Sequence, residues 1–236
     1  MEWLLSNSAM VLERAGQHLV LALVPMVLGL VISLPLAQLA RISPVLRTVV
    51  LTASSLLYTI PSLALFIILP SLLGTRILDP LNVIVALTIY AVALLVRAAL
   101  DAFDSVDEDL RQAAVAMGYK PWQRFLQIDM PLSLPVLFAG LRVVSVSNIS
   151  LVSVAALLGV GNLGMLFTDG LQRTFVTEVV VGILAILVLA LAMDAVLVLL
   201  ERLLTPWTRA AKAAGPSPAV SAGMVADARI HAGARS

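Results

Sequence analysis

Five long apolar segments set the strongest limit on what this chain of 236 residues can fold into. A helix needs roughly 20 residues to cross about 30 Å of hydrocarbon, and each segment is at least that long. The segments lie at residues 18–40, 48–73, 80–100, 136–158 and 177–200. The sequence therefore predicts an all-α membrane protein with about five transmembrane helices and its two termini on opposite sides of the membrane.

Composition supports a membrane location and excludes other classes of protein. Hydrophobic residues make up 61% of the chain and charged residues 12%, whereas a water-facing surface needs about a quarter of its residues charged. The near balance of Lys+Arg 15 against Asp+Glu 14 provides no basic surface for a nucleic acid. With no Cys, and with only His18 and His231 as imidazoles, we expect no metal and no cofactor.

The positions of Lys and Arg predict the orientation, because cytoplasmic loops carry the positive excess. With the N-terminus outside, only Arg14, Arg76 and Arg173 fall on the outer side, and the other twelve basic residues fall inside. The long polar link at residues 101–135 and the C-terminus are then cytoplasmic. We expect a multi-pass protein of the cell membrane.

The two ends differ from the middle of the chain. Residues 1–17 are too mixed in polarity to cross a membrane, so we expect an outer interfacial segment with Trp3 as an anchor. The first apolar run is too long for a signal peptide, and its positive flank is on the wrong side. We expect the membrane domain to cover residues 18–206, and residues 207–236, rich in Ala, Gly, Pro and Ser, to be a disordered cytoplasmic tail.

The cytoplasmic link contains signals for two short helices. Ser105 with Glu108 has the pattern of a capping box and predicts a helix start just before Asp107. Gly118 predicts the end of that helix, because glycine readily adopts the left-handed conformation there. Pro121 then suits the first turn of a second helix, expected to run through Gln127. Two short helices have little core of their own, so this bent knob should pack against a partner protein.

The same link resembles the EAA signature of bacterial ABC-importer permeases, E-A-A-x3-G-x9-I-x-L-P. The match keeps the full spacing, with Gln in place of Glu and Met in place of Leu. The matching residues are Gln112, Ala113, Ala114, Gly118, Ile128, Met130 and Pro131. The resemblance implies that this loop couples to a separate ATPase. Small Ala113 and Ala114 would then let the helix sit deep in a groove of that ATPase, with Gly118 setting the bend.

The resemblance extends over roughly residues 18–206 and implies a type I ABC-importer permease fold. Residues 58–74 (YTIPSLALFIILPSLLG) and 149–164 (ISLVSVAALLGVGNLG) are similar to permeases for glycine betaine, carnitine, choline and related osmoprotectants. Such a permease works with two ATPases, a second permease that is identical or paralogous, and an extracytoplasmic binding protein. An importer of amino acids such as proline or methionine is the alternative, and a secondary carrier is a further one.

Other motifs argue against enzymatic activity in this chain. It has no G-x-x-x-x-G-K-[ST] motif to bind a nucleotide, so its ATPase must be a separate chain. Gly159, Gly161 and Gly164 spell G-x-G-x-x-G, but they follow a transmembrane segment on the outer side and predict a tight turn near the docking place of a binding protein. A secondary carrier is usually built from internal repeats, and these five segments show none.

A polar stripe runs along the second apolar segment with helical spacing. It consists of Thr48, Thr52, Ser55, Thr59 and Ser62, with Ser54 and Tyr58 beside it. The stripe should face the bundle, where it either lines the transport pathway or hydrogen-bonds to neighbouring helices. Tyr58 is a candidate for a weak cation–π contact with a quaternary amine. Pro61 should break or kink this helix.

The last two segments contain an amide and a possible charge pair. Asn148 is costly to leave in lipid, so it is a candidate for the pathway or a permease interface, with a helix-packing hydrogen bond as the equal alternative. Arg142 and Asp194 each lie six residues inside a predicted cytoplasmic boundary, roughly 9 Å deep. We expect them to pair; otherwise Asp194 bonds to a Ser, to the backbone or to interfacial water, and Arg97 is the substitute partner.

Overall fold

The computed structural model describes residues 2–208, so nearly all of the tail expected at residues 207–236 lies outside the described residues. The chain divides into two units, residues 1–201 and 202–236. Within residues 2–208 all regular structure is helical. The α-helices are α1 (Glu2–Ser6), α2 (Ser8–Ala40), α3 (Pro44–Thr59), α4 (Ser62–Leu73), α5 (Pro80–Asp104), α6 (Glu108–Ala116), α7 (Pro121–Arg124), α8 (Met130–Val152), α9 (Met165–Gln172) and α10 (Val176–Leu204).

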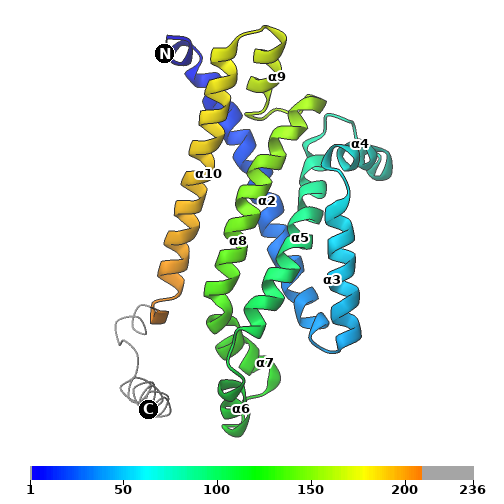
Figure 1. Cartoon of the computed structure of the whole chain (residues 1–236), viewed down its shortest axis with the longest axis vertical. Helices are drawn as coiled ribbons and strands as arrows, with labels where there is room; N and C mark the ends of the chain where they lie inside the picture. Colours follow the sequence, from blue (N-terminus) through cyan, green and yellow to red (C-terminus); the bar gives the residue numbers. More distant parts are fainter. Residues whose placement is uncertain (1, 209–236) are drawn as a thin grey trace, which may run out of the picture. The chain divides into compact units, whose positions relative to one another are not determined.

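Four uninterrupted helical runs in the described part of the chain are long and apolar enough to cross a membrane. They are α2, α5, the run from Pro121 to Leu158 that contains α8, and α10. The pair α3 and α4 meets the same test together, but the two helices are bent by 98°. In Figure 1, α3 lies beside α5 and α4 turns away from that direction. The expected all-α membrane fold with about five spans is confirmed, and the segment expected as the second span is divided into two helices.

The break between α3 and α4 has a local cause. Pro61 has no N–H to donate, and Ile60 before it takes the extended conformation, with φ −64° and ψ 127°. The hydroxyl of Tyr90 on α5 donates to the carbonyl oxygen of Ile60 at 2.6 Å, so a carbonyl at the break is satisfied by a neighbouring helix. The break predicted at Pro61 is confirmed.

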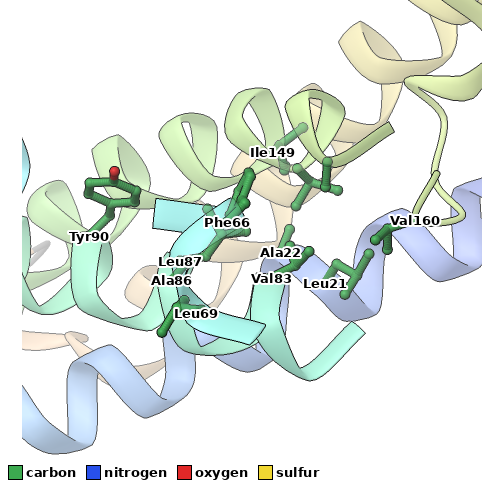
Figure 2. Close-up of a cluster of buried hydrophobic side chains, with 12 residues drawn as sticks. Leu21, Ala22, Phe66, Leu69, Val83, Ala86, Leu87, Tyr90, Ile149 and Val160 are labelled. Carbon is green, nitrogen blue, oxygen red and sulfur yellow. The ribbon is translucent and has the colours of Figure 1, made fainter. Parts of the chain in front are cut away.

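The centre of the bundle is formed by α2, α5 and α8. Figure 2 shows one cluster of buried side chains, to which α2, α4, α5 and α8 contribute, with Phe66 and Leu87 both fully buried. Small residues allow close helix contacts: a Cβ on Gly29 would lie 2.6 Å from that of Ala91, and a Cβ on Gly140 would lie 2.4 Å from that of Ala98. Membrane helices commonly pack in this way, because lipid provides no hydrophobic force between them.

Several helix boundaries differ from those expected. Helix α2 begins at Ser8 and continues without a break through residue 17, so a separate outer segment ends before Ser8. Trp3 on α1 packs edge-to-face on Phe175, with ring centroids 5.9 Å apart. After α8 the chain continues as a 3₁₀ helix, Ser153–Leu158. Helix α9 was not expected, because its eight residues are too few to show a helical period.

Candidate functional site

Helix α6 begins with a different cap from the one expected. Asp107 is the N-cap, and its carboxylate accepts from the N–H of Asp109 at 2.9 Å. The predicted cap, Ser105, is wrong: it still has helical φ and ψ at the end of α5, and its hydroxyl donates to the carbonyl of Ala102 at 2.7 Å. An N-cap needs extended backbone, which Asp107 has with ψ 132°.

The end of α6 has the predicted glycine geometry. Gly118 has φ 84°, its N–H donates to the carbonyl of Val115 at 3.0 Å, and the N–H of Tyr119 donates to Ala114 at 3.1 Å. This is the Schellman pattern, in which two orphan carbonyls are satisfied by a left-handed residue. The chain then reverses direction toward Pro121, and this turn sets the angle of α6.

The second short helix is not a separate element. Pro121 starts α7 as predicted, but α7 passes through a π-helical turn, Phe125–Asp129, directly into α8. The expectation that this helix stops at Gln127 is therefore wrong, because the π turn keeps the backbone hydrogen-bonded. Figure 1 shows α6 and α7 together at one end of the bundle, with α4 and α9 at the other. Helix α6 is thus joined by one short turn to an extension of a spanning helix.

The residues of the EAA-like signature divide into exposed and packed groups. Gln112, Ala113 and Gly118 are exposed, whereas Ile128 and Pro131 are half-buried. Ala114 is fully buried within this chain, so its small size serves packing here and not the entry of α6 into a partner. Around the exposed positions lie five large apolar side chains that are at least half exposed: Leu110, Val115, Met117, Trp122 and Leu126.

A buried carboxylate in the π turn pairs with arginines of α6 and α7, and no motif in the sequence predicted it. Asp129 is 2% exposed, and its oxygens lie 3.1 Å from Nε of Arg111 and 3.7 Å from Nε of Arg124. Arg111 also reaches Glu108 at 3.1 Å and donates to the carbonyl of Phe103 on α5. Asp129 lies at a position where the signature accepts any residue. The sequence indicated it only as an acidic residue just before a spanning segment, with basic residues nearby.

A second ionic group joins the end of α2 and the start of α3 to the end of α5. Asp104 lies 2.7 Å from Nη1 of Arg47 and 3.8 Å from Nε of Arg41. The guanidinium of Arg41 stands 5.6 Å from the ring centroid of Phe103, which itself packs on Phe125. Burial, followed by the charge of Arg111, lowers the pKa of Arg41. The guanidinium stays charged at physiological pH.

The polar stripe of α3 is exposed in this single chain. Of the helix's residues only Ser54 is buried. The hydroxyls of Thr48, Ser55 and Thr59 donate to carbonyls of α3 itself, at 3.0, 2.9 and 2.7 Å. The stripe is therefore not buried within this single chain, and its role in the pathway or in helix contacts stays a prediction. One contact reaches a neighbouring helix: Nη2 of Arg97 on α5 lies 3.4 Å from Oγ of Ser55.

Two tyrosines lie next to the stripe. Tyr58 is 43% exposed and packs edge-to-face on Tyr90, with ring centroids 5.8 Å apart. Tyr90 is buried and held by its hydrogen bond to Ile60. Ser62, in the first turn of α4, is half-buried. The candidates Ser55, Tyr58, Thr59 and Ser62 therefore flank the α3–α4 break.

Asn148 belongs to helix packing. It is 1% exposed, and its Nδ2 donates to the carbonyl of Ala22 on α2 at 3.2 Å. Nearby, Nε2 of His18 lies 2.8 Å from the carbonyl oxygen of Ile149, so two side chains bridge α2 and α8. Of the alternatives considered for Asn148, the structure contains the packing hydrogen bond and leaves no exposed amide for a pathway.

Arg142 and Asp194 lie together. Nε and Nη2 of Arg142 donate to the two carboxylate oxygens of Asp194, at 2.6 and 2.9 Å. This two-pronged arrangement matches the planar fork of arginine to a carboxylate. It joins α8 to α10, and α10 has only Glu178, Gly182 and Leu197 buried among its described residues. Arg97, the substitute partner, contacts Ser55 instead.

The glycines after α8 form a closed turn. Gly159 has φ 83°, and the N–H of Gly164 donates to Oδ1 of Asn162 at 2.6 Å. A Cβ on Gly164 would lie 2.4 Å from the carbonyl oxygen of Ser153, so glycine is needed for close approach. The predicted tight turn is confirmed. No group of three or more His, Asp or Glu side chains within the described residues is arranged to hold a metal ion.

Broken and continuous apolar helices form the fold, and α6 and α7 with the EAA-like signature lie together at one end of it. The family model described as binding-protein-dependent transport system inner membrane component matches residues 26–209. The chain belongs to this family, as the sequence resemblance indicated, and it is a permease subunit located in the membrane.

Individual relatives agree with this assignment. The chain is 36% identical over 207 residues to the osmoprotectant import permease protein OsmW of Salmonella typhimurium, covering 86% of this chain and 96% of that one. It is 28% identical to the glycine betaine/carnitine/choline transport system permease protein OpuCB of Bacillus subtilis, covering 87% and 94%. The fold matches a chain of the MetNI methionine ABC transporter, with TM-score 0.67, 19% identity and coverage of 81% and 96%.

Proposed function

We propose that this permease carries quaternary-amine osmoprotectants such as glycine betaine, carnitine or choline in an ATP-driven importer. The observation that carries the proposal is the 36% identity to the osmoprotectant permease over 96% of its length. The fold match to a methionine transporter supports the fold alone, because its identity is only 19%. The exposed ring of Tyr58 is chemically suited to such substrates, since aromatic faces attract quaternary ammonium groups.

The proposed partners follow from surfaces that one chain leaves uncovered. Large apolar side chains such as Met117 and Trp122 are 68% and 59% exposed on the cytoplasmic loop. Such a patch next to Gln112 and Ala113 suits docking to an ATPase, and ATP hydrolysis then belongs to that separate chain. The stripe of α3 is exposed beside Arg97, and a second permease subunit would enclose this face. An extracytoplasmic binding protein delivers the substrate to the outer end.

Uptake in a strain that lacks this gene tests the proposal. Labelled glycine betaine, carnitine, choline, proline and methionine are supplied separately, with and without the gene restored on a plasmid. We expect uptake of at least one quaternary amine to fall in the deletion strain and to return with the plasmid. Loss of proline or methionine uptake alone would favour the amino-acid importer, and unchanged uptake of every compound would overturn the proposal.

A further inference from the structure

Arg97 is a charged side chain within a spanning helix, and the described residues provide no carboxylate for it. No Asp or Glu in residues 2–208 is within ion-pair distance of its guanidinium, and its side chain is exposed. Its depth is shown by its neighbour Ala98, which packs against Gly140 of α8. Arg142 is two residues from Gly140, so Arg97 and the paired Arg142 lie at similar depths.

The guanidinium of Arg97 has free hydrogen-bonding capacity. Its contact is Oγ of Ser55 at 3.4 Å, and that hydroxyl already donates its proton to the carbonyl of Leu51 at 2.9 Å. Ser55 can therefore only accept from Arg97. A guanidinium carries five N–H donors in a planar fork that fits a carboxylate. Several of these donors remain available for an anionic group on the exposed face.

An aromatic ring lies one helical turn away on the same face. Tyr58 is three residues after Ser55 on α3, a spacing that places side chains about 5–6 Å apart. Its ring is 43% exposed and is braced by the buried Tyr90, whose hydroxyl is bonded to Ile60. The face thus presents a fixed cation beside an aromatic surface, which is the complement of a short zwitterion.

We propose that Arg97, Ser55 and Tyr58 form a transit site for a zwitterion. Its carboxylate binds the Arg97 guanidinium, and its quaternary ammonium group lies on the Tyr58 ring. This inference rests on the proposed function and narrows it. The permease itself then favours substrates that carry a carboxylate, such as glycine betaine, over choline, which has the same ammonium group without the carboxylate.

The test measures the ratio of glycine betaine uptake to choline uptake by the complete importer, with its own ATPase and binding protein. Arg97→Gln should lower this ratio by about tenfold, because a charge-assisted hydrogen bond is lost for one substrate only. Arg97→Lys keeps the charge and should stay within about threefold of the wild type. The matched control is Arg76→Gln, which removes an exposed arginine from the outer loop between α4 and α5. This control should leave the ratio unchanged.

A Tyr58 pair tests the other half of the site. Tyr58→Leu should lower uptake of both substrates, whereas Tyr58→Phe keeps the aromatic face and should preserve uptake of both. An unchanged ratio in Arg97→Gln, with wild-type uptake intact, would overturn the transit site and leave the proposed function standing. Loss of co-purification between Arg97→Gln permease and its partner subunits would assign Arg97 to a subunit contact and also overturn the site. Absence of glycine betaine, carnitine and choline uptake in the wild type would overturn the proposed function itself.

Discussion

The α8–α10 side of this permease pairs its arginine with a carboxylate, whereas the α3–α5 side leaves its arginine without one among the described residues. On α8, Arg142 is held by both oxygens of Asp194, so the charge is neutralised within the chain. On α5, Arg97 at a similar depth contacts only the hydroxyl of Ser55 among the described residues. A charge paired inside the chain serves assembly of the helices. A charge left open on a polar face remains available for a molecule from outside.

The surroundings of the two arginines follow the same division. Helix α10 exposes apolar side chains such as Val188 and Leu191, at 64% and 61%, which suits contact with lipid. Helix α3 exposes hydroxyl-bearing residues such as Thr48 and Ser55 beside apolar ones such as Val49 and Leu56, at 57% and 63%. Lipid therefore fits the exposed face of α10, whereas the exposed face of α3 is mixed and carries the charge of Arg97 beside it.

The largest effect is expected where paired charges are most deeply buried, at Asp129. Asp129→Ala would take the buried carboxylate away from Arg124 and from Arg111, whose side chain is only 12% exposed and would keep only the exposed Glu108 and the carbonyl of Phe103. Breaking a buried pair in this way costs about 3 kcal/mol or more of stability. Thermal unfolding of the purified permease in detergent should show a clear fall in Tm. Glu108→Gln removes an exposed partner of the same Arg111 and is the control, with a cost below about 0.5 kcal/mol. Equal costs would show that burial of the pair is unimportant.

Removal of the carboxylate on the α8–α10 side should be the next largest effect. Asp194→Ala leaves the Arg142 charge without a partner inside the membrane, and we expect the level of the protein in membranes to fall several-fold. The exchange of Arg142→Asp with Asp194→Arg should recover part of that level, as measured by immunoblotting of membrane fractions. A double variant no better than either single variant would contradict a structural role for the pair.

Gly118 tests whether coupling can be separated from assembly. Gly118→Val places a β-branched residue at φ 84°, at a cost of about 1–2 kcal/mol, and should misdirect α6. We expect nearly normal membrane levels with strongly reduced uptake. Gly118→Asn is the matched variant, because Asn tolerates the left-handed conformation and no neighbouring atom lies within 4 Å of a Cβ there. Normal substrate-stimulated ATP hydrolysis by Gly118→Val importer would remove this turn from coupling.

The smallest effect on stability is expected at Arg97. This variant tests the difference between the two arginines most directly. Arg97→Gln breaks no ion pair within the described chain, so its membrane level and Tm should stay near those of the wild type. Arg142→Gln is the same change at a similar depth. It leaves Asp194 without its partner and should lower both the membrane level and the Tm. Membrane immunoblots and melting curves of the two variants, made side by side, provide the measurement. A fall in Arg97→Gln as large as in Arg142→Gln would mean that both charges serve assembly.

Local backbone chemistry made several features predictable from the sequence. The break at Pro61 and the left-handed Gly118 follow from one residue each, through a missing N–H and a missing Cβ. Span lengths follow from the thickness of the bilayer. The Arg142 and Asp194 pair was expected because charges at equal depth in two cytoplasmic ends have few other ways to be neutralised.

Only the tertiary structure decided which way each helix face points. The stripe on α3 and Asn148 are both polar in the sequence. The stripe is exposed, whereas Asn148 is buried and its amide donates to the carbonyl of Ala22. The π turn joins α7 directly to α8. In this arrangement Ala114 is buried, and the carboxylate of Asp129 lies beside Arg111 of α6. Residue spacing defines the position of a side chain around its own helix. Which neighbour it meets depends on how that helix is rotated and docked, and distant residues determine this rotation.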